Sequence, residues 1–305
     1  MAVSHLTKDL DLTTAEVLSL LELARRVKRA PRKYAHKLSG RYLALLFEKP
    51  SLRTRMTFEL AIKQLGGDAI FSETNGKGIG EREPLKDIAR NLARWVHGIV
   101  ARTYHQETVE ELALWAAIPV INALSDRYHP CQALADFLTL QERFGELRGL
   151  KLAFVGDGNN VAHSLMLEAA RLGVDMRVCT PPGYEPNAEV AASARALAAE
   201  SGAKLRLGYD AYEAVEEAHA VYTDVWASMG QEGEAKERRT VFAPCQVTAR
   251  LMARARPEAV FMHCLPAHRD EEVTEEVIES PASIVFDQAE NRLHAQKALL
   301  LMMLS

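Results

Sequence analysis

The stretch Phe47–Arg55, with the sequence FEKPSLRTR, decides the fold around it. It follows a continuous apolar run, Tyr42–Phe47, that is typical of a buried strand, and it precedes apolar residues at helical spacing from 56 to 65. Pro50 and Ser51 stand at the junction, where a helix start favours proline and a capping hydroxyl. A strand, a tight turn and a helix start bring free backbone N–H groups and the positive end of a helix dipole to one point. The sequence therefore predicts an anion site here.

The side chains of this turn suit a phosphate. Ser51 and Thr54 supply hydroxyl groups, and Arg53 and Arg55 supply guanidinium forks that match several acceptor oxygens at once. The alternative is a capped helix that carries two solvated arginines. Spacing alone does not separate the two interpretations.

Length and composition bound the class of protein. A chain of 305 residues has room for two domains and a large core, and 48% apolar with 26% charged residues is ordinary for a soluble globular protein. The formal net charge of −4 argues against an extended nucleic-acid or membrane-binding surface, so a phosphate site must be local. No signal pattern and no membrane-spanning apolar run is visible, and we expect a cytoplasmic protein.

The four cysteines, Cys131, Cys179, Cys245 and Cys264, have no paired spacing. A disulfide framework or a zinc knuckle is therefore not expected. Cys264 follows His263 directly, and adjacent side chains do not readily converge on one metal, so we expect no metal site.

A glycine-rich turn in the second half of the chain raises the question of a dinucleotide fold. Lys151–Asn160, KLAFVGDGNN, is predicted to form a buried strand and a turn that leads into a helix at Ala162–Leu172. The dinucleotide fingerprint requires a third glycine three residues after Gly158, where Val161 stands. The next predicted strand, Met176–Thr180, is followed by two prolines and has no acidic residue to hold a ribose. Both observations disfavour an oxidoreductase.

Polar side chains follow two further predicted strands. Arg102 comes after the strand Gly98–Ala101, and an arginine at the carboxyl end of a parallel strand points into the crevice where such sheets bind ligands; a plain solvated arginine is the alternative. The strand Ala220–Asp224 leads into DVWASMG, where Asp224 offers a negative charge for an ammonium group. In the same segment Ser228 adds a hydroxyl and Met229 can cover an aliphatic stem. The charged run Gln231–Arg239 that follows is typical of a solvated loop.

FEKPSLRTR closely resembles the Ser-x-Arg-Thr-Arg signature of the aspartate/ornithine carbamoyltransferase family. Further matches follow in order over nearly the whole chain: ARTY at 101–104, HPCQ at 129–132, GDGNN at 156–160, DVWASMG at 224–230, HCLP at 263–266 and ENR at 290–292. Aspartate-specific members carry basic residues in the loop that corresponds to DVWASMG. The match is therefore closest to the ornithine-specific members.

The resemblance implies a carbamoyl-phosphate site. In it Arg102 binds the carbonyl and phosphate oxygens, His129 the carbonyl oxygen and Gln132 the carbamoyl amide. In the family, the loop Ser72–Pro84 reaches into the site of a neighbouring subunit. Gly78 stands where ornithine-specific members usually place Gln or His, which makes Lys77 the preferred donor. The implied carbamoyl-phosphate set is Ser51, Leu52, Arg53, Thr54, Lys77, Arg102, His129, Gln132 and Arg292.

The resemblance also implies an ornithine site. Asn160 binds the amino-acid carboxylate, the Cys264 thiol and the Leu265 carbonyl contact the reacting δ-amine, and 231–239 forms a lid. A turn asparagine that caps only its own backbone, and an inert core cysteine, are the alternatives. The implied ornithine set is Asn160, Asp224, Ser228, Met229, Cys264 and Leu265, and the implied catalytic set is Arg102, His129, Asp224 and Cys264.

The expected reaction is carbamoyl transfer from carbamoyl phosphate to L-ornithine, giving L-citrulline and phosphate. No metal or organic cofactor is expected, because phosphate is already an activated leaving group. Another amine, such as putrescine or an N-acylated ornithine, is the alternative within the family. A dinucleotide-dependent oxidoreductase or a noncatalytic sensor is the alternative outside it.

The expected fold is α/β, with two doubly wound parallel-sheet domains and the active site in the cleft between them. Residues 1–144 should form the carbamoyl-phosphate domain and 145–288 the ornithine domain, divided at the glycines of Gly145–Gly149. By resemblance, the amphipathic helix 289–305 packs back on the first domain, and the protein is a homotrimer with shared active sites.

Overall fold

The computed structural model describes residues 5–74, 78–227 and 232–305. The chain forms two compact units: unit 1 comprises Met1–Leu138 with Glu290–Ser305, and unit 2 comprises Thr139–Ala289. The chain enters unit 2 within helix α5 (Pro130–Phe144) and returns to unit 1 within helix α12 (Val285–Leu304). Each unit is an α/β domain built on a parallel sheet, which confirms the predicted fold class. The predicted division at residue 144 stays a prediction.

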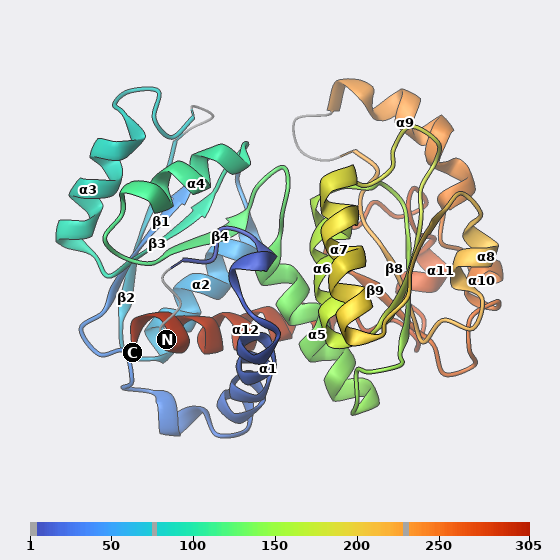
Figure 1. Cartoon of the computed structure of the whole chain (residues 1–305), viewed down its shortest axis with the longest axis horizontal. Helices are drawn as coiled ribbons and strands as arrows, with labels where there is room; N and C mark the ends of the chain where they lie inside the picture. The colour runs from blue at the N-terminus through green and yellow to red at the C-terminus, as the bar shows by residue number, and fades with distance from the viewer. Residues whose placement is uncertain (1–4, 75–77, 228–231) are drawn as a thin grey trace. The chain divides into compact units, whose positions relative to one another are not determined.

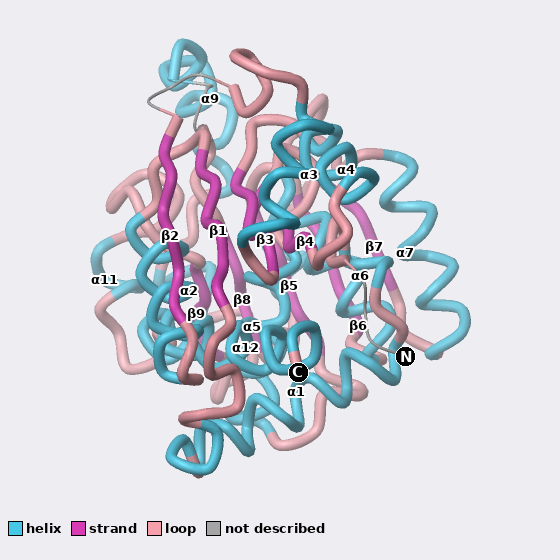
Figure 2. Tube along the Cα trace, turned by 90° about the vertical axis from the view of Figure 1, so that its left-hand side faces the viewer, coloured by secondary structure: helices cyan, strands magenta, loops and turns pink. Residues whose placement is uncertain are grey.

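Unit 1 contains a sheet with the strand order β2-β1-β3-β4 (Figure 2). Every pairing is parallel. Parallel sheets are covered on both faces, which explains why their strands are almost continuously apolar. All five residues of β3 are buried, for example. The strands are β1 (Tyr42–Phe47), β2 (Asp68–Glu73), β3 (Gly98–Arg102) and β4 (Val120–Leu124).

Helices cover both faces of this sheet (Figure 1). α3 and α4 bury Ala89, Val109 and Leu112 against Ile99 and Ala101 on one face. α2 and α12 lie on the other. The helices of unit 1, besides α5 and α12, are α1 (Thr14–Arg29), α2 (Leu52–Gln64), α3 (Leu85–Trp95) and α4 (Gln106–Trp115), with 3-10 turns at Asp9–Asp11 and Pro31–Tyr34.

Unit 2 contains a sheet with the strand order β7-β6-β5-β8-β9, again parallel throughout. The strands are β5 (Lys151–Val155), β6 (Asp175–Cys179), β7 (Leu205–Gly208), β8 (Ala220–Thr223) and β9 (Val260–His263). The helices are α6 (Asn160–Leu172), α7 (Ala188–Ser201), α8 (Ala211–Val215), α9 (Ala235–Phe242), α10 (Ala249–Met252) and α11 (Glu275–Ile278), with 3-10 turns at Glu232–Glu234 and Ala243–Cys245. α6 and α7 lie on one side of the sheet and α8, α10 and α11 on the other (Figure 1).

The strand order places the sequence motifs. In unit 1 the chain moves from β1 outward to β2 and then returns to the other side of β1 with β3; in unit 2 β5 stands likewise between β6 and β8. Ligands of open α/β sheets bind outside the carboxyl ends of the strands at such a reversal point. The FEKPS turn follows β1 and the GDGNN turn follows β5. Both motifs therefore lie where each sheet is built to hold a ligand.

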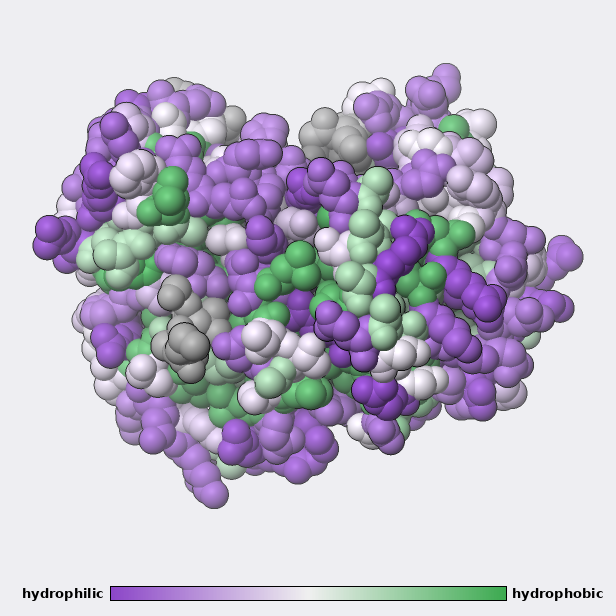
Figure 3. Space-filling model, viewed as in Figure 1, coloured by the Kyte–Doolittle hydropathy of each residue, from purple (hydrophilic) through white to green (hydrophobic). Residues whose placement is uncertain are grey.

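Within the described ranges, no helix is both long and apolar enough to cross a membrane. Hydrophilic side chains predominate around the periphery of the face that Figure 3 shows.

Candidate active site

The turn after β1 builds a helix N-terminus with a side-chain cap. Ser51 has an extended backbone (φ −161°, ψ 109°), and its Oγ accepts the Thr54 N–H at 3.3 Å. The cap starts α2 at Leu52, four residues before the apolar spacing begins, because capping and not burial sets the first turn. The Leu52 side chain is exposed (74%) and has no hydrogen-bond donor, so only the Leu52 backbone can serve an anion at this turn. Arg53 is half-buried in the same turn.

Arg292 connects three of the predicted residues. Its guanidinium is buried, with Nη2 donating to Thr54 Oγ1 at 2.8 Å and Nη1 donating to Gln132 Oε1 at 2.8 Å. Gln132 in turn donates through Nε2 to Asp136 at 2.7 Å. Residues from α2, α5 and α12 thus meet in unit 1, although they lie far apart in the sequence.

Arg102 and His129 belong to the same electrostatic environment. Arg102 ends β3 and His129 precedes α5, and both are buried. Burial, together with the positive charges of Arg292 and Arg102, holds the pKa of His129 well below its usual value. The imidazole is therefore neutral at physiological pH. It can donate a hydrogen bond without adding a third positive charge.

Glu48 organises the surroundings of Arg102 and was missed by the sequence analysis. Its buried carboxylate accepts the backbone N–H of Tyr104 at 2.5 Å and of Ile79 at 2.6 Å. Its own N–H donates to the Arg102 carbonyl at 2.9 Å. An acidic residue inside the phosphate motif was the available signal. Lys77, the predicted loop donor, lies outside the described residues.

In unit 2 the glycines of GDGNN serve close packing. A Cβ on Gly158 would lie 2.3 Å from the backbone nitrogen of Pro186, so no other residue fits this turn without displacing the backbone. The Gly158 N–H also donates to the Tyr184 carbonyl at 3.0 Å. The motif thus has a physical reason that does not involve a dinucleotide.

Asn159, which the sequence analysis also missed, joins two motifs. Its Oδ1 caps α6 by accepting the N–H groups of Val161 and Ala162, and its Nδ2 donates to Asp224 Oδ2 at 2.8 Å. An asparagine directly before a helix is a typical cap, which was the available signal. The predicted residue Asn160 follows as the first residue of α6 and is buried.

Asp224 is also contacted from the third motif. The Cys264 thiol donates to Asp224 Oδ1 at 3.0 Å, so both carboxylate oxygens are held by neutral donors. Cys264 is half-buried, unlike the three other cysteines, which are buried. Leu265 has a left-handed backbone (φ 57°), a conformation that a non-glycine residue keeps only when its surroundings enforce it. The ends of β5, β8 and β9 thus converge on one carboxylate.

The expectation that His263 and Cys264 cannot converge on one metal is wrong. A ligand atom from each, and one from Asp224, lie within 4.8 Å of one another, because the chain turns sharply after β9. His263 is nevertheless held by the protein: Nδ1 accepts the Leu265 N–H at 2.8 Å, and Nε2 lies 3.2 Å from a Glu272 carboxylate oxygen. A metal would have to displace one of these contacts.

The expectation of a solvated loop at 231–239 is correct in part. Most side chains of 233–239 are exposed, but 232–239 form a 3-10 turn and the start of α9 instead of a loop. Arg238 is buried there and donates to Asp157 Oδ2 at 2.9 Å and to the Trp226 carbonyl at 2.8 Å. The buried carboxylate of Asp157, in the GDGNN turn, thus forms an ion pair with Arg238. Burial still raises the pKa of Asp157 to about 6, and the Arg238 charge opposes the rise. Ser228 and Met229 lie outside the described residues.

The two units therefore offer complementary chemistry. Unit 1 has buried arginines, a neutral imidazole, an amide and a capped helix start, which suit a phosphate beside a carbonyl group. Unit 2 has a carboxylate held by an amide and a thiol, which suits an ammonium group. We call these residues the phosphate-side set (Thr54, Arg102, His129, Gln132 and Arg292) and the amine-side set (Asn159, Asp224 and Cys264).

Family models agree with this division. The carbamoyl-phosphate-binding domain of aspartate/ornithine carbamoyltransferases matches residues 4–142, and the Asp/Orn-binding domain matches residues 148–303. The chain belongs to the aspartate/ornithine carbamoyltransferase family. In this carbamoyltransferase most of the phosphate-side set lies within the first match; Arg292, in the returning helix, lies within the second.

Similar carbamoyltransferases cover its full length. An ornithine carbamoyltransferase of Pyrococcus abyssi is 50% identical over 310 residues, with 100% of this chain and 98% of the relative aligned. An anabolic ornithine carbamoyltransferase of Pyrococcus furiosus is 51% identical over 306 residues, with 98% and 97% aligned. A solved structure of ornithine carbamoyltransferase from Pyrococcus furiosus superposes with a TM-score of 0.96 at 50% identity, covering 99% of this chain and 97% of that chain.

Proposed function

We propose that this carbamoyltransferase transfers the carbamoyl group of carbamoyl phosphate to the δ-amine of L-ornithine, giving L-citrulline and phosphate. The observation that carries the proposal is Asp224, a carboxylate held in place by Asn159 and Cys264. A site for aspartate would need positive charge for a second carboxylate. The full-length relatives named for ornithine support the same substrate.

The phosphate-side set would bind carbamoyl phosphate and stabilise charge. Attack on the carbonyl carbon builds negative charge on the carbonyl oxygen, and preorganised donors placed for that charge lower the barrier. We assign this role to Arg102, His129 and Thr54. The capped start of α2, with Arg53, would hold the phosphate as it leaves with the electron pair of the broken C–O bond. The low pKa of His129 keeps it a neutral donor through the reaction.

The amine-side set would bind ornithine. The δ-amine of ornithine is mostly protonated at neutral pH, as lysine is, and must lose a proton before it attacks. Cys264 donates its hydrogen to Asp224, so Asp224 is the group of this set that carries negative charge. It therefore supplies the countercharge for an ammonium group. Asn160 at the start of α6 is assigned to the amino-acid carboxylate, in line with a helix N-terminus.

Citrulline formation tests the substrate. Purified protein is incubated with carbamoyl phosphate and, separately, L-ornithine, putrescine, N-acetylornithine or L-aspartate at equal concentrations. We expect kcat/KM to be highest for ornithine by at least about 100-fold, because the other amines leave a buried polar group of the site unpaired. A preference for putrescine or N-acetylornithine would make that amine, and not ornithine, the proposed substrate. Turnover of aspartate would overturn the assignment of Asp224. The relative named anabolic supports our placing the reaction in arginine biosynthesis, and we propose the cytoplasm as its location.

We further propose a homotrimer in which each site is shared. α2 carries exposed apolar side chains one turn apart: Leu52 (74%), Met56 (47%) and Leu60 (40%); Ile70 on the edge strand β2 adds another (63%). Apolar residues clustered on one surface are typical of a protein interface. The adjoining loop from Ser72 to Pro84 would carry Lys77 into a neighbour's phosphate site.

Complementation tests the shared site. Arg53→Ala and a variant with 77–80 replaced by alanine are each expected to be inactive. Mixed trimers should recover part of the activity, because some interfaces then combine an intact loop with an intact Arg53. Recovery in mass-verified hybrids supports sharing. Absence of recovery in such hybrids, or full activity of the loop variant alone, rejects it.

A further inference from the structure

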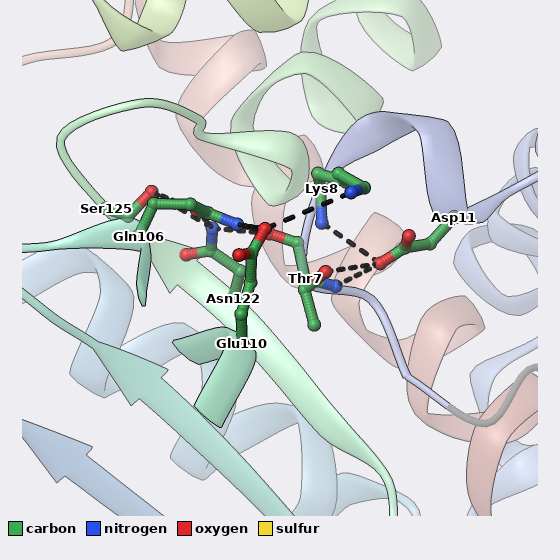
Figure 4. Close-up of polar contacts among 7 residues, drawn as sticks. All are labelled: Thr7, Lys8, Asp11, Gln106, Glu110, Asn122 and Ser125. Atoms are coloured by element: carbon green, nitrogen blue, oxygen red, sulfur yellow. Dashed lines mark hydrogen bonds and ion pairs between the residues drawn. The ribbon is translucent and has the colours of Figure 1, made fainter. Parts of the chain in front are cut away.

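A buried polar network joins Thr7, Gln106, Asn122 and Ser125 (Figure 4). Ser125 lies four residues before His129 in the sequence. The centre of the network is Ser125, whose hydroxyl is fully buried. Ser125 Oγ donates to Gln106 Oε1 at 2.6 Å and accepts the backbone N–H groups of Tyr128 at 3.1 Å and Arg127 at 3.3 Å. One hydroxyl thus holds the backbone of the loop that leads directly to His129.

Side chains from two other elements fix that hydroxyl. Asn122 on β4 donates through Nδ2 to Ser125 Oγ at 3.2 Å, to Gln106 Oε1 at 3.1 Å and to the Thr7 carbonyl at 2.8 Å. Gln106 at the start of α4 donates through Nε2 to the same Thr7 carbonyl at 3.1 Å. Asn122 is fully buried, and Gln106 and Thr7 are 4% and 8% exposed, so the network is largely shielded from bulk water.

The N-terminal segment closes the network. Leu6 pairs with Ile121 of β4 in a parallel β-bridge. The Leu6 N–H donates to the Val120 carbonyl at 2.8 Å, and the Leu6 carbonyl accepts the Asn122 N–H at 2.7 Å. This pairing places the Thr7 carbonyl over Asn122 and Gln106 (Figure 4). The segment before α1 is thereby part of the support for the loop.

The loop is also tied at its far end. The Ser125 N–H donates to the Tyr128 carbonyl at 3.0 Å, which closes the turn. The next residue, His129, accepts the N–H groups of Gln132 at 3.0 Å and Ala133 at 3.2 Å through its carbonyl and so begins α5. The backbone of His129 is consequently fixed between a hydrogen-bonded turn and a helix start.

We propose that Ser125 is a positioning residue for His129, with Gln106 and Asn122 fixing its hydroxyl. The inference rests on the proposed carbamoyl transfer, in which His129 stabilises the carbonyl oxygen. A donor must be held at the place where charge develops, and a displacement of about 1 Å costs on the order of 100-fold in rate. Removal of the Ser125 hydroxyl leaves the buried Gln106 acceptor and two backbone donors without this partner, so the loop must rearrange.

The primary test is Ser125→Ala in the full-length protein. We expect kcat to fall at least tenfold, with the KM for ornithine within about twofold of the wild type, because the amine-side set belongs to the other unit. Ser125→Thr keeps the hydroxyl and should restore most of kcat. The matched control is Ser201→Ala in unit 2, where a partly buried hydroxyl donates to the Ala170 carbonyl at 2.5 Å; it should leave kcat unchanged.

A double-mutant cycle with His129→Asn separates positioning from general destabilisation. If Ser125 acts through His129, the effect of Ser125→Ala on kcat nearly disappears in the His129→Asn background. An equal effect in both backgrounds overturns the proposal, as does a wild-type kcat in folded Ser125→Ala. If Ser125→Ala does not fold, Gln106→Met is combined with His129→Asn in its place. A loss of its effect on kcat in the His129→Asn background supports the proposal, and an equal effect in both backgrounds overturns it. A wild-type protein that forms no citrulline rejects the proposed function instead.

Discussion

The phosphate-side set in unit 1 and the amine-side set in unit 2 occupy the same topological position but carry opposite charge. Thr54 lies in the helix that follows β1 and Asn159 lies in the turn that follows β5, and in each sheet this is the strand at which the strand order reverses. In unit 1, Arg292 is held by the neutral partners Thr54 and Gln132. In unit 2, Asp224 is held by the neutral partners Asn159 and Cys264. The same backbone plan thus fixes a positive charge in one unit and a negative charge in the other.

The comparison shows how a buried charge is kept available for a substrate. A hydrogen bond from a neutral group orients a charged side chain without cancelling its charge, whereas an ion pair cancels it. Asp157 gives the contrast within unit 2, because Arg238 neutralises it directly. We infer that Asp224 carries the charge that binds substrate and that Asp157 holds α9 in place.

The largest expected effect comes from removing a charge at the phosphate side. Arg53 is half-buried in the free protein and would be covered by the bound phosphate. Arg53→Ala should therefore lower kcat/KM for carbamoyl phosphate by about 100- to 1,000-fold, since loss of such a charged contact costs about 3 to 4 kcal/mol. Steady-state kinetics measure it. The control is Arg55→Ala, two residues on, where an exposed guanidinium stacks 3.8 Å from the Phe71 ring; it should change kcat/KM less than threefold. Equal losses would remove the distinction between the two arginines.

At the amine side, Asp224→Asn keeps the shape and removes the charge. We expect kcat/KM for ornithine to fall about 100-fold, the order expected when one partner of a buried charge pair is lost. Carbamoyl-phosphate affinity, measured by calorimetry, should stay within about twofold. Asp210→Asn, at the exposed cap of α8, is the matched control and should leave both quantities unchanged. Loss of both affinities in Asp224→Asn would make Asp224 a structural residue.

The pH dependence of turnover should come from the amine side alone. We expect kcat/KM for ornithine to rise from pH 6 to 8, by at most about tenfold per unit, because only the neutral amine attacks. Burial and two nearby arginines hold the pKa of His129 well below its usual value, so His129→Asn should lower the rate and keep the slope. A flat profile would mean that amine deprotonation does not limit the rate. A slope that disappears in His129→Asn would assign the titration to His129.

The smallest expected effects concern the pH dependence of the free energy of unfolding. As pH falls, the contribution of Asp157 in unit 2 increases and that of His129 in unit 1 decreases. The pKa of Asp157 is raised from 3.8 to about 6 in the folded protein, so its contribution to the free energy of unfolding increases as pH falls from 7 to 4, by at most about 3 kcal/mol. The pKa of His129 is lowered, so its contribution is present above pH 6.5 and is lost as pH falls below that value.

Denaturant unfolding of the wild type, Asp157→Asn and His129→Asn between pH 4 and 7.5 measures both contributions. As pH falls, the wild type should gain stability relative to Asp157→Asn and lose stability relative to His129→Asn. Parallel curves for the wild type and either variant would contradict the corresponding burial effect.

The sequence determined the elements of this protein and the places where its ligand-binding motifs begin. β1 (Tyr42–Phe47) has the predicted bounds and α6 (Asn160–Leu172) ends where predicted, because a continuous apolar run and a 3.6-residue apolar period can both be recognised in the local sequence. The absence of a third glycine after Gly158 argued against a dinucleotide fold without any structure. The carbamoyltransferase family was recognisable because its motifs are short, ordered and rich in polar residues.

The tertiary structure decided which polar residues meet. Arg292 reaches Thr54, and Arg238 reaches Asp157, over separations of 238 and 81 residues that no local pattern records. Glu48 binds the backbone of Tyr104, Asn159 binds the Asp224 side chain and Ser125 binds the Gln106 side chain. Strand order brings these partners together, so each of the three was an ordinary polar residue in the sequence. Hydrophobic periodicity can be recognised in the local sequence. The partner of a buried charge or hydroxyl is determined only when the sheet brings distant strand ends together.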